Sequence, residues 1–329
     1  MFYQVKYFGN FSFGTRYFVN LEIVENNHLN LYNMKKIAVI GAGTMGNGIA
    51  HVFAQSGFET ALVDISQSAL DKALATIQKN LDRLIKKERI SEDDKNATVN
   101  RITPFTSIKK GIENADLIIE AATENEEIKL KIFKELDTES KPDAILASNT
   151  SSISITKIAA VTGKPDKVIG MHFMNPVPIM KLVEIIKGYK TSDEVLNTVM
   201  ELSKKLGKVP VEVNDFPGFV ANRILIPMIN EAIITLNRGV AGVYEIDTVM
   251  KLGMAHPMGP LQLADFIGLD VCLAITEVLY EGLGEAKYAP SPLLRTMVDA
   301  GNLGVKSGEG FYSWTHNTKE LIVADRFKK

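Results

Sequence analysis

A histidine and a glutamate twelve residues apart, His172 and Glu184, have the types and spacing of a catalytic base and its orienting partner. Glu184 lies between Val183 and Ile185, where burial of an unpaired carboxylate would be costly. If the proline-bearing turn at residues 175–178 folds the two segments side by side, Glu184 can accept a hydrogen bond from one imidazole nitrogen and raise the basicity of the other. The pair would then be a general base. A histidine that only completes a core or surface hydrogen bond is the alternative.

A glycine-rich segment, Gly41-Ala42-Gly43-Thr44-Met45-Gly46, could bind a dinucleotide. Its glycines permit a tight turn, close approach of the backbone to a pyrophosphate and close helix packing, while the following helix end attracts phosphate. Asp64 stands 23 residues after Gly41, where its carboxylate can hold a ribose 2′-hydroxyl and would repel a 2′-phosphate. These features predict an NAD site and favour NAD over NADP. A glycine turn with an unrelated strand-end aspartate is the structural alternative.

Three further groups of polar residues are open to two interpretations. Ser151 belongs to the serine-rich run at residues 148–152 and either faces a ligand or caps the next helix. Asn222 lies inside an apolar helix, where its amide needs a partner, and it either caps a neighbouring backbone group or points into the cleft between the domains. A basic stripe is either a solvated helix face or a clamp for the phosphates of a bulky anionic substrate; it consists of Lys79, Arg83, Lys86 and Lys87.

The composition excludes several classes of protein. The 329 residues are 46% apolar and 23% charged, as in globular proteins, and at roughly 150 residues per domain they suggest two domains. A formal charge of −2 provides no global field for nucleic acid or an anionic membrane. The single cysteine, Cys272, cannot form an intramolecular disulfide, and five scattered histidines show no zinc spacing. We therefore expect no metal site and a cytoplasmic location.

The predicted site residues need a sheet to position them. From Lys35 onward, short β-branched runs alternate with amphipathic ones, which is typical of a parallel sheet with helical crossovers. Ligands bind beyond the carboxyl ends of such strands, where Asp64 and His172 fall. We expect strands at residues 37–40, 60–64, 101–105, 117–121, 144–148 and 167–172, then shorter ones at 181–187 and 208–213.

The chain changes character near residue 214, after which only helices are expected, at residues 219–238, 244–252, 260–279 and 292–300. The fold class predicted is therefore α/β: a Rossmann-type NAD-binding domain, residues 34–214, followed by an all-α C-terminal domain, residues 215–329. The first helix of the second domain is apolar almost all round. We expect it to be buried against other helices or a second subunit.

Residues 1–33 form an atypical leader, rich in aromatic side chains and poor in charged ones. Polar residues interrupt every apolar run, so neither a secretory signal nor a membrane span is expected there. We expect the functional chain to start at Met34. The alternative is an extra strand or arm packed on the body, in which case deletion of the leader would lower the melting temperature or the activity.

From Met34 to about Trp314 the sequence resembles the 3-hydroxyacyl-CoA dehydrogenase family, most closely its short stand-alone bacterial members. The likeness rests on six motifs: GAGTMGNGIA at residues 41–50, EAATEN at 120–125, SNTSS at 148–152, HFMNPVPIMKLVE at 172–184, PGFVANR at 217–223 and KSGEGFY at 306–312. Together these motifs are far more specific than the glycine loop alone.

The resemblance implies reversible, NAD-dependent oxidation of an L-3-hydroxyacyl-CoA, with 3-hydroxybutyryl-CoA as substrate, by a homodimer that the helical domain builds. By this likeness His172 is the base and Glu184 its partner, while Ser151 and Asn222 bond the 3-oxygen of the substrate. Further residues fall where the family contacts NAD and the active centre (Glu124, Lys129, Ser151 and Asn175) or the CoA group (Lys87 and Asn80, the latter where some relatives have serine).

Two rival functions remain open at this stage. A dehydrogenase of the same fold could oxidise a free hydroxy acid or sugar acid, because a histidine–glutamate pair serves any secondary alcohol; the basic stripe and CoA dependence separate the two. An NAD-binding sensor without turnover is the other rival, and the complete set of Ser151, His172, Glu184 and Asn222 speaks against it. Acyl-chain length and the physiological direction do not follow from the sequence.

Overall fold

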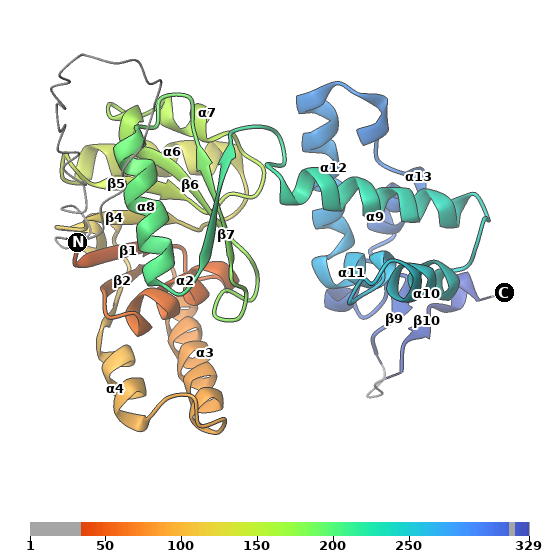
Figure 1. Cartoon of the computed structure of the whole chain (residues 1–329), viewed down its shortest axis with the longest axis horizontal. Coiled ribbons are helices and arrows are strands. Elements are labelled where there is room, and N and C mark those ends of the chain that lie inside the picture. The colour runs from red at the N-terminus through yellow and green to blue at the C-terminus, as the bar shows by residue number, and fades with distance from the viewer. Residues whose placement is uncertain (1–33, 316–319, 329) are drawn as a thin grey trace, which may run out of the picture.

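A computed structural model describes residues 34–315 and 320–328. The expectations for residues 1–33 lie outside this range. Figure 1 shows a part built on a sheet and a helical part, joined by the segment between strand β8 and helix α9. Within the described residues, no helix is both long and apolar enough to cross a membrane.

Eight strands form one sheet in the order β3-β2-β1-β4-β5-β6-β7-β8. The first six are parallel and have the strand order of a Rossmann fold. Strand β7 runs antiparallel to β6, because only a short turn at residues 174–181 connects them. The strands are β1 Lys36–Ile40, β2 Glu59–Val63, β3 Ile102–Phe105, β4 Leu117–Glu120, β5 Ile145–Ser148, β6 Val168–Phe173, β7 Leu182–Lys187 and β8 Val209–Asn214.

Helices cover both faces of this sheet (Figure 1). Alternate strand residues point to opposite faces, so Ile37 and Val39 of β1 belong to one core, and Ala38 and Ile40 to the other. Helices α2, α3 and α8 pack on the first face and α5, α6 and α7 on the second. Their bounds, with that of the neighbouring α4, are α2 Thr44–Gln55, α3 Gln67–Ile85, α4 Glu92–Asn100, α5 Ile108–Ile112, α6 Glu126–Glu139, α7 Ile155–Ala159 and α8 Asp193–Lys205.

The helical part has its own core. Two expectations were wrong here. The helix predicted over 260–279 is two helices, because Gly268 adopts a φ of +100°, which ends α11 and starts α12 in a new direction. Only helices were expected after residue 214, but residues 312–313 and 322–323 form paired strands. The helices are α9 Ala221–Asn237, α10 Val243–Gly253, α11 Pro260–Ile267, α12 Leu269–Leu283 and α13 Pro292–Asp299; two short strands, β9 Tyr312–Ser313 and β10 Ile322–Val323, pair beyond them.

Two buried carboxylates hydrogen-bond residues 311–314 to the helices of this part. Asp265 of α11 accepts hydrogen bonds from the backbone N–H groups of Phe311 and Tyr312 and from the Trp314 indole, each at 2.9 Å. The Tyr312 hydroxyl donates to Asp247 of α10 at 2.7 Å. Burial raises the pKa of Asp265 to about 6, although its three donors favour the charged form. Residues 311–314 are thereby fixed against α10 and α11.

Candidate active site

The glycine loop follows β1 and adopts a backbone that only glycine permits. Gly41 has a φ of +102°, and a Cβ atom there would lie 2.6 Å from the carbonyl oxygen of Ala121, which follows β4. At Gly46, inside α2, a Cβ atom would lie 1.8 Å from the carbonyl oxygen of Gly41. The first glycine therefore allows the turn, and the third lets α2 pack against it.

The amino end of α2 is open to a ligand. Gly43 is exposed and precedes Thr44 and Met45, the first residues of the helix. A Cβ atom at Gly43 would meet nothing within 4 Å. No side chain caps this helix end and no acidic residue occupies its first turn, so its positive partial charge is left available. These features fit a pyrophosphate.

Asp64 lies beside the glycine loop, as its spacing predicts. One carboxylate oxygen accepts a hydrogen bond from the backbone N–H of Ala42 at 2.8 Å, and the other from that of Ser66 at 2.9 Å. The carboxylate is only partly buried. Its negative charge at this place suits a ribose diol and disfavours a 2′-phosphate.

A buried ion pair that the sequence analysis missed supports the neighbouring loop. Lys129 of α6 is 1% exposed, and its ammonium donates to both oxygens of Glu120, at 2.7 and 2.9 Å. The Ser148 hydroxyl also donates to Glu120, at 2.7 Å. The available signal was a carboxylate at the end of the otherwise apolar strand β4, the same argument that singled out Glu184.

Glu124 gathers the loops that follow β4 and β5. One of its oxygens accepts hydrogen bonds from the Thr150 hydroxyl at 2.6 Å, from the Ser151 backbone N–H at 2.8 Å and from the Ser151 hydroxyl at 3.2 Å. Its other oxygen lies 3.4 Å from the Lys129 ammonium. Burial opposes the charged form, but Lys129 and these donors together lower the pKa of Glu124 below its ordinary value.

His172 and Glu184 face each other directly across β6 and β7, which confirms the turn expected between them. Imidazole Nδ1 and a Glu184 oxygen are 2.8 Å apart, and both side chains are buried. In the neutral ring, Nδ1–H donates to the carboxylate, which leaves Nε2 unprotonated and able to act as a base. The ring lies against Phe219, with the ring centroids 6.0 Å apart.

The second oxygen of Glu184 binds the helical part. It accepts hydrogen bonds from the backbone N–H groups of Val220 at 3.1 Å and Ala221 at 2.9 Å, where α9 begins. Burial opposes the charged form, but the bonds from His172 and Ala221 outweigh it and lower the pKa of Glu184 below its ordinary value. Glu184 is therefore a charged partner for an imidazolium.

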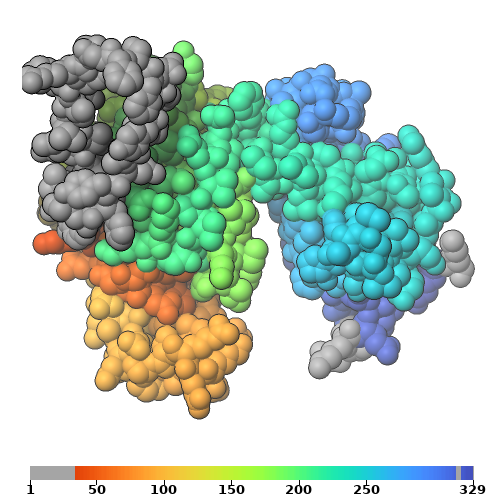
Figure 2. All heavy atoms as spheres, viewed as in Figure 1, coloured from red at the N-terminus to blue at the C-terminus, as the bar shows by residue number. Residues whose placement is uncertain are grey.

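Asn222, on the first turn of α9, also reaches across to the sheet. Its side-chain amide donates to the backbone carbonyl of Ser151 at 3.1 Å. The structure therefore brings together the predicted residues Ser151, His172, Glu184 and Asn222 where the two parts meet. Figure 2 shows a hollow between these parts beside their junction.

Other predicted residues lie farther out. Asn175 is exposed on the turn between β6 and β7. Asn80 lies on α3, where its side chain accepts a bond from Arg83 at 3.4 Å, and Lys87 is exposed just beyond the helix end. For residues 34–315 and 320–328, no hydrogen bond or ion pair joins Asn80 or Lys87 to the other predicted site residues.

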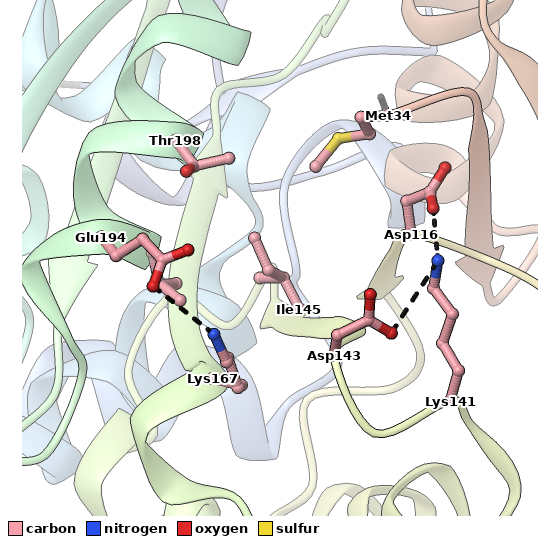
Figure 3. A pocket seen from close by; sticks show the side chains of 9 residues that line it. Met34, Asp116, Lys141, Asp143, Ile145, Lys167, Glu194 and Thr198 are labelled. Atoms are coloured by element: carbon pink, nitrogen blue, oxygen red, sulfur yellow. Dashed lines mark hydrogen bonds and ion pairs between the residues drawn. The ribbon is translucent and has the colours of Figure 1, made fainter. Parts of the chain in front are cut away.

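A separate pocket lies at the opposite edge of the sheet (Figure 3). Asp116, Asp143 and Lys167 line it and precede strands β4, β5 and β6. Lys141 lies 2.5 Å from Asp116 and 4.0 Å from Asp143, so its one positive charge partly offsets the two carboxylates. Because parallel strands place their amino ends at one edge, this pocket is remote from the glycine loop. Among the described residues, no group of three or more His, Cys, Asp or Glu side chains could hold a metal ion.

The fold and the site define a class of protein. A Rossmann-type sheet with an open glycine loop and a buried histidine–glutamate pair at the same sheet edge is the arrangement of an NAD-binding dehydrogenase. Comparison with known families identifies which one. Residues 36–216 match the 3-hydroxyacyl-CoA dehydrogenase NAD binding domain, and residues 218–314 match the 3-hydroxyacyl-CoA dehydrogenase C-terminal domain. The chain belongs to the 3-hydroxyacyl-CoA dehydrogenase family.

Individual relatives are similar over most of the chain. A probable 3-hydroxybutyryl-CoA dehydrogenase of Deinococcus radiodurans is 57% identical over 85% of this chain and 100% of its own length. A 3-hydroxybutyryl-CoA dehydrogenase of Clostridioides difficile is 53% identical over 85% and 99%. The crystal structure of (S)-3-hydroxybutyryl-CoA dehydrogenase from Ralstonia eutropha has a TM-score of 0.83 and 53% identity, over 86% of this chain and 100% of that one.

The open helix end at Gly43 predicts that a substitution there can weaken NADH binding without lowering the stability of the protein. In a Gly43→Asn variant the new side chain occupies the space above α2 and caps its N–H groups. We expect an unchanged or slightly raised melting temperature, since Asn is a good N-cap, but NADH binding weaker by about tenfold or more, measured by fluorescence titration.

Gly46→Ala is the matched control, because its added Cβ atom would strike the carbonyl of Gly41. This variant should lose stability as well as binding. Wild-type NADH affinity in Gly43→Asn would show that the phosphates do not lie at this helix end.

Proposed function

We propose that this chain catalyses the reversible, NAD-dependent oxidation of an L-3-hydroxyacyl-CoA to the 3-ketoacyl-CoA, with 3-hydroxybutyryl-CoA as its substrate. The observation that carries the proposal is the bond between His172 and Glu184 at the same sheet edge as the glycine loop. Relatives that are 53–57% identical bear the name of this activity. The residues around Gly41, Gly43, Gly46 and Asp64 would hold the NAD.

The proposed proton transfer uses His172 Nε2. In the oxidation direction this nitrogen takes the proton of the substrate hydroxyl group. The glycine loop and Asp64 would hold NAD⁺, which would supply the acceptor for the hydride from C3. The resulting imidazolium keeps its Nδ1–H bond to the charged Glu184 carboxylate. Because both side chains are buried from water, this carboxylate stabilises the imidazolium in place of solvent. In the reverse direction the same imidazolium returns its proton to the C3 oxygen, so one residue serves both directions.

Five more residues complete the proposed site. Ser151 and Asn222 would bond the substrate 3-oxygen, and the contact between the Asn222 amide and the Ser151 backbone supports this by placing them side by side. Glu124 and Asn175 would contact the nicotinamide end of NAD. Lys129 is buried against Glu120, so we propose that it acts by holding Glu124 in place.

The CoA group would lie against the basic stripe. The chain has a net charge of −2 and must supply positive charge for the CoA phosphates locally. The residues of the stripe are exposed, on α3 or just after it. We propose that Lys87 and Asn80 contact the CoA group; the stripe is Lys79, Arg83, Lys86 and Lys87.

We also propose a homodimer built by the helical part. Exposed apolar side chains on α9 and α10 include Ile224, 68% exposed, and Leu252, 82% exposed. Such exposure favours an interface, and a second copy offers the same surface in return. We retain the division at residues 34–214 and 215–329 as our proposal for the domains. A cytoplasmic location is proposed from the single cysteine, and cell fractionation would test it.

The proposed substrate and cofactor predict a selective reaction. With acetoacetyl-CoA as substrate, the purified protein should oxidise NADH but not NADPH. With free acetoacetate it should oxidise neither cofactor. The absorbance of the reduced cofactor measures both reactions. A Lys87→Ala variant should raise the KM for acetoacetyl-CoA, whereas Lys110→Ala, which removes an exposed lysine elsewhere, should not. Turnover of the free acid would favour a hydroxy-acid dehydrogenase, and NADH binding without turnover would favour a sensor.

The hydrogen bonds at the two oxygens of Glu184 predict that the effects of its charge and of its shape can be measured separately. In Glu184→Gln the amide oxygen can still accept from the start of α9, but the NH₂ group faces His172 Nδ1 and forces the wrong tautomer. We expect kcat to fall by about a hundredfold or more with little change in melting temperature. Glu184→Ala should lose both activity and about 1–3 kcal/mol of stability. Turnover of Glu184→Gln within a few-fold of wild type would refute the mechanism.

The dimer predicts a mass of twice 36.2 kDa by sedimentation equilibrium. Ile224→Asp and Leu252→Asp should shift the protein toward monomer, because each would bury a charge in the interface. Tyr189→Asp, at an exposed position on the sheet part, is the control and should leave the mass unchanged. A monomeric wild-type protein would contradict the proposal.

A further inference from the structure

Lys208 is a buried lysine that the mechanism does not use. It lies just before β8 and is 8% exposed. Its ammonium donates hydrogen bonds to the backbone carbonyls of Val177 and Met180, the latter at 2.8 Å. Both carbonyls belong to the turn at residues 174–181, which joins the strand of His172 to the strand of Glu184. A side chain remote in sequence therefore fixes the turn between the two catalytic strands.

The same turn packs on the helix that receives the cofactor phosphates. Val177 is buried, and a Cβ atom at Gly48 of α2 would lie 2.8 Å from the Val177 Cβ atom. One turn along α2, His51 is fully buried, and burial together with the charge of Lys208 lowers its pKa to about 4. The imidazole is therefore neutral at pH 7. Lys208, the turn and α2 form one cluster.

The charge of Lys208 is costly to bury, which indicates a specific use. In the described part of the chain no carboxylate lies within ion-pair distance of it, and burial lowers its pKa. Its two carbonyl acceptors are the only compensation that the structure describes. The turn also has internal bonds: the N–H groups of Ile179 and Met180 both donate to the carbonyl of Pro176, at 3.0 and 2.9 Å. Ile179 is nevertheless 74% exposed, so apolar packing does not hold the tip in place.

We infer that Lys208 is a positioning residue for the cofactor: by holding the turn at residues 174–181 against α2, it places Asn175 at the nicotinamide end of NAD. The inference rests on the proposed contact of Asn175. Without the ammonium, the carbonyls of Val177 and Met180 lose their donor and the turn can shift as a unit. His172 and Glu184 lie inside the paired strands and keep their register.

The test compares Lys208→Met and Lys208→Gln with wild type and with Lys204→Met, which removes an exposed lysine of the adjacent helix α8. Lys208→Met should bind NADH about tenfold more weakly and raise the KM for NADH to match, with a smaller change in kcat at saturating NADH. Lys208→Gln, which keeps an N–H donor group but is uncharged and shorter, should fall between. Trypsin should cut Lys208→Met faster than wild type after the exposed Lys181. Lys204→Met should behave as wild type.

A purely structural role gives a different result. Melting temperature and active fraction would then fall while the dissociation constant and KM for NADH stayed at the wild-type values, and the inference would be overturned. Faster cleavage with unchanged NADH affinity would overturn it too. If Lys208→Met does not fold, the NADH affinity and the trypsin cleavage rate of Lys208→Gln test the inference instead. Because NADH titration and proteolysis need no turnover, they test Lys208 even if the proposed reaction fails in wild type.

Discussion

The carboxylate of Glu184 is hydrogen-bonded at both oxygens, and the active site depends on the bonds at each of them. One oxygen is hydrogen-bonded to His172 Nδ1, while the other accepts hydrogen bonds from the backbone N–H groups at the start of α9. Orientation of the base and docking of the helical part therefore depend on one charged group. The positive amino end of α9 in turn helps to keep that carboxylate charged when it is buried. Removal of Glu184 would leave partly buried N–H groups without this acceptor, and an unoriented imidazole.

The protein has almost no net charge, so any anionic ligand must be bound by local positive groups. The chain is close to neutral, so the proposed site offers the cofactor phosphates backbone N–H groups and a helix end rather than a general positive surface. Asp64 adds a single negative charge beside the loop, where it can distinguish a ribose hydroxyl from a phosphate. The exposed basic stripe, on α3 or just after it, is our proposed site for the second, more highly charged ligand, CoA. The proposed cofactor and CoA sites thus differ in the physical means of binding.

Buried ionic groups occur beside the loops that carry the site. Lys129 with Glu120 supports the loop after β4, Glu184 supports the start of α9, and Lys208 supports the turn after β6. These loops expose part of their surface to ligands, so apolar packing alone cannot fix them. Directional bonds in a region of low dielectric constant can, provided that each charged group is compensated. At these three places the cost of burying charge is incurred where position matters for the proposed chemistry.

Local patterns in the sequence determined the strands of the large sheet, three of the four helices expected after residue 214, the glycine loop and the pairing of His172 with Glu184. Periodicity, turn chemistry and the cost of an unpaired carboxylate act over short stretches of chain. Tertiary structure decided the rest. Lys129 pairs with Glu120, the second oxygen of Glu184 binds α9, and Lys208 reaches a turn 28 to 31 residues away. The break at Gly268 likewise appears only in the fold. Sheet register and domain docking set these contacts, and a single sequence does not specify which distant groups they bring within bonding distance.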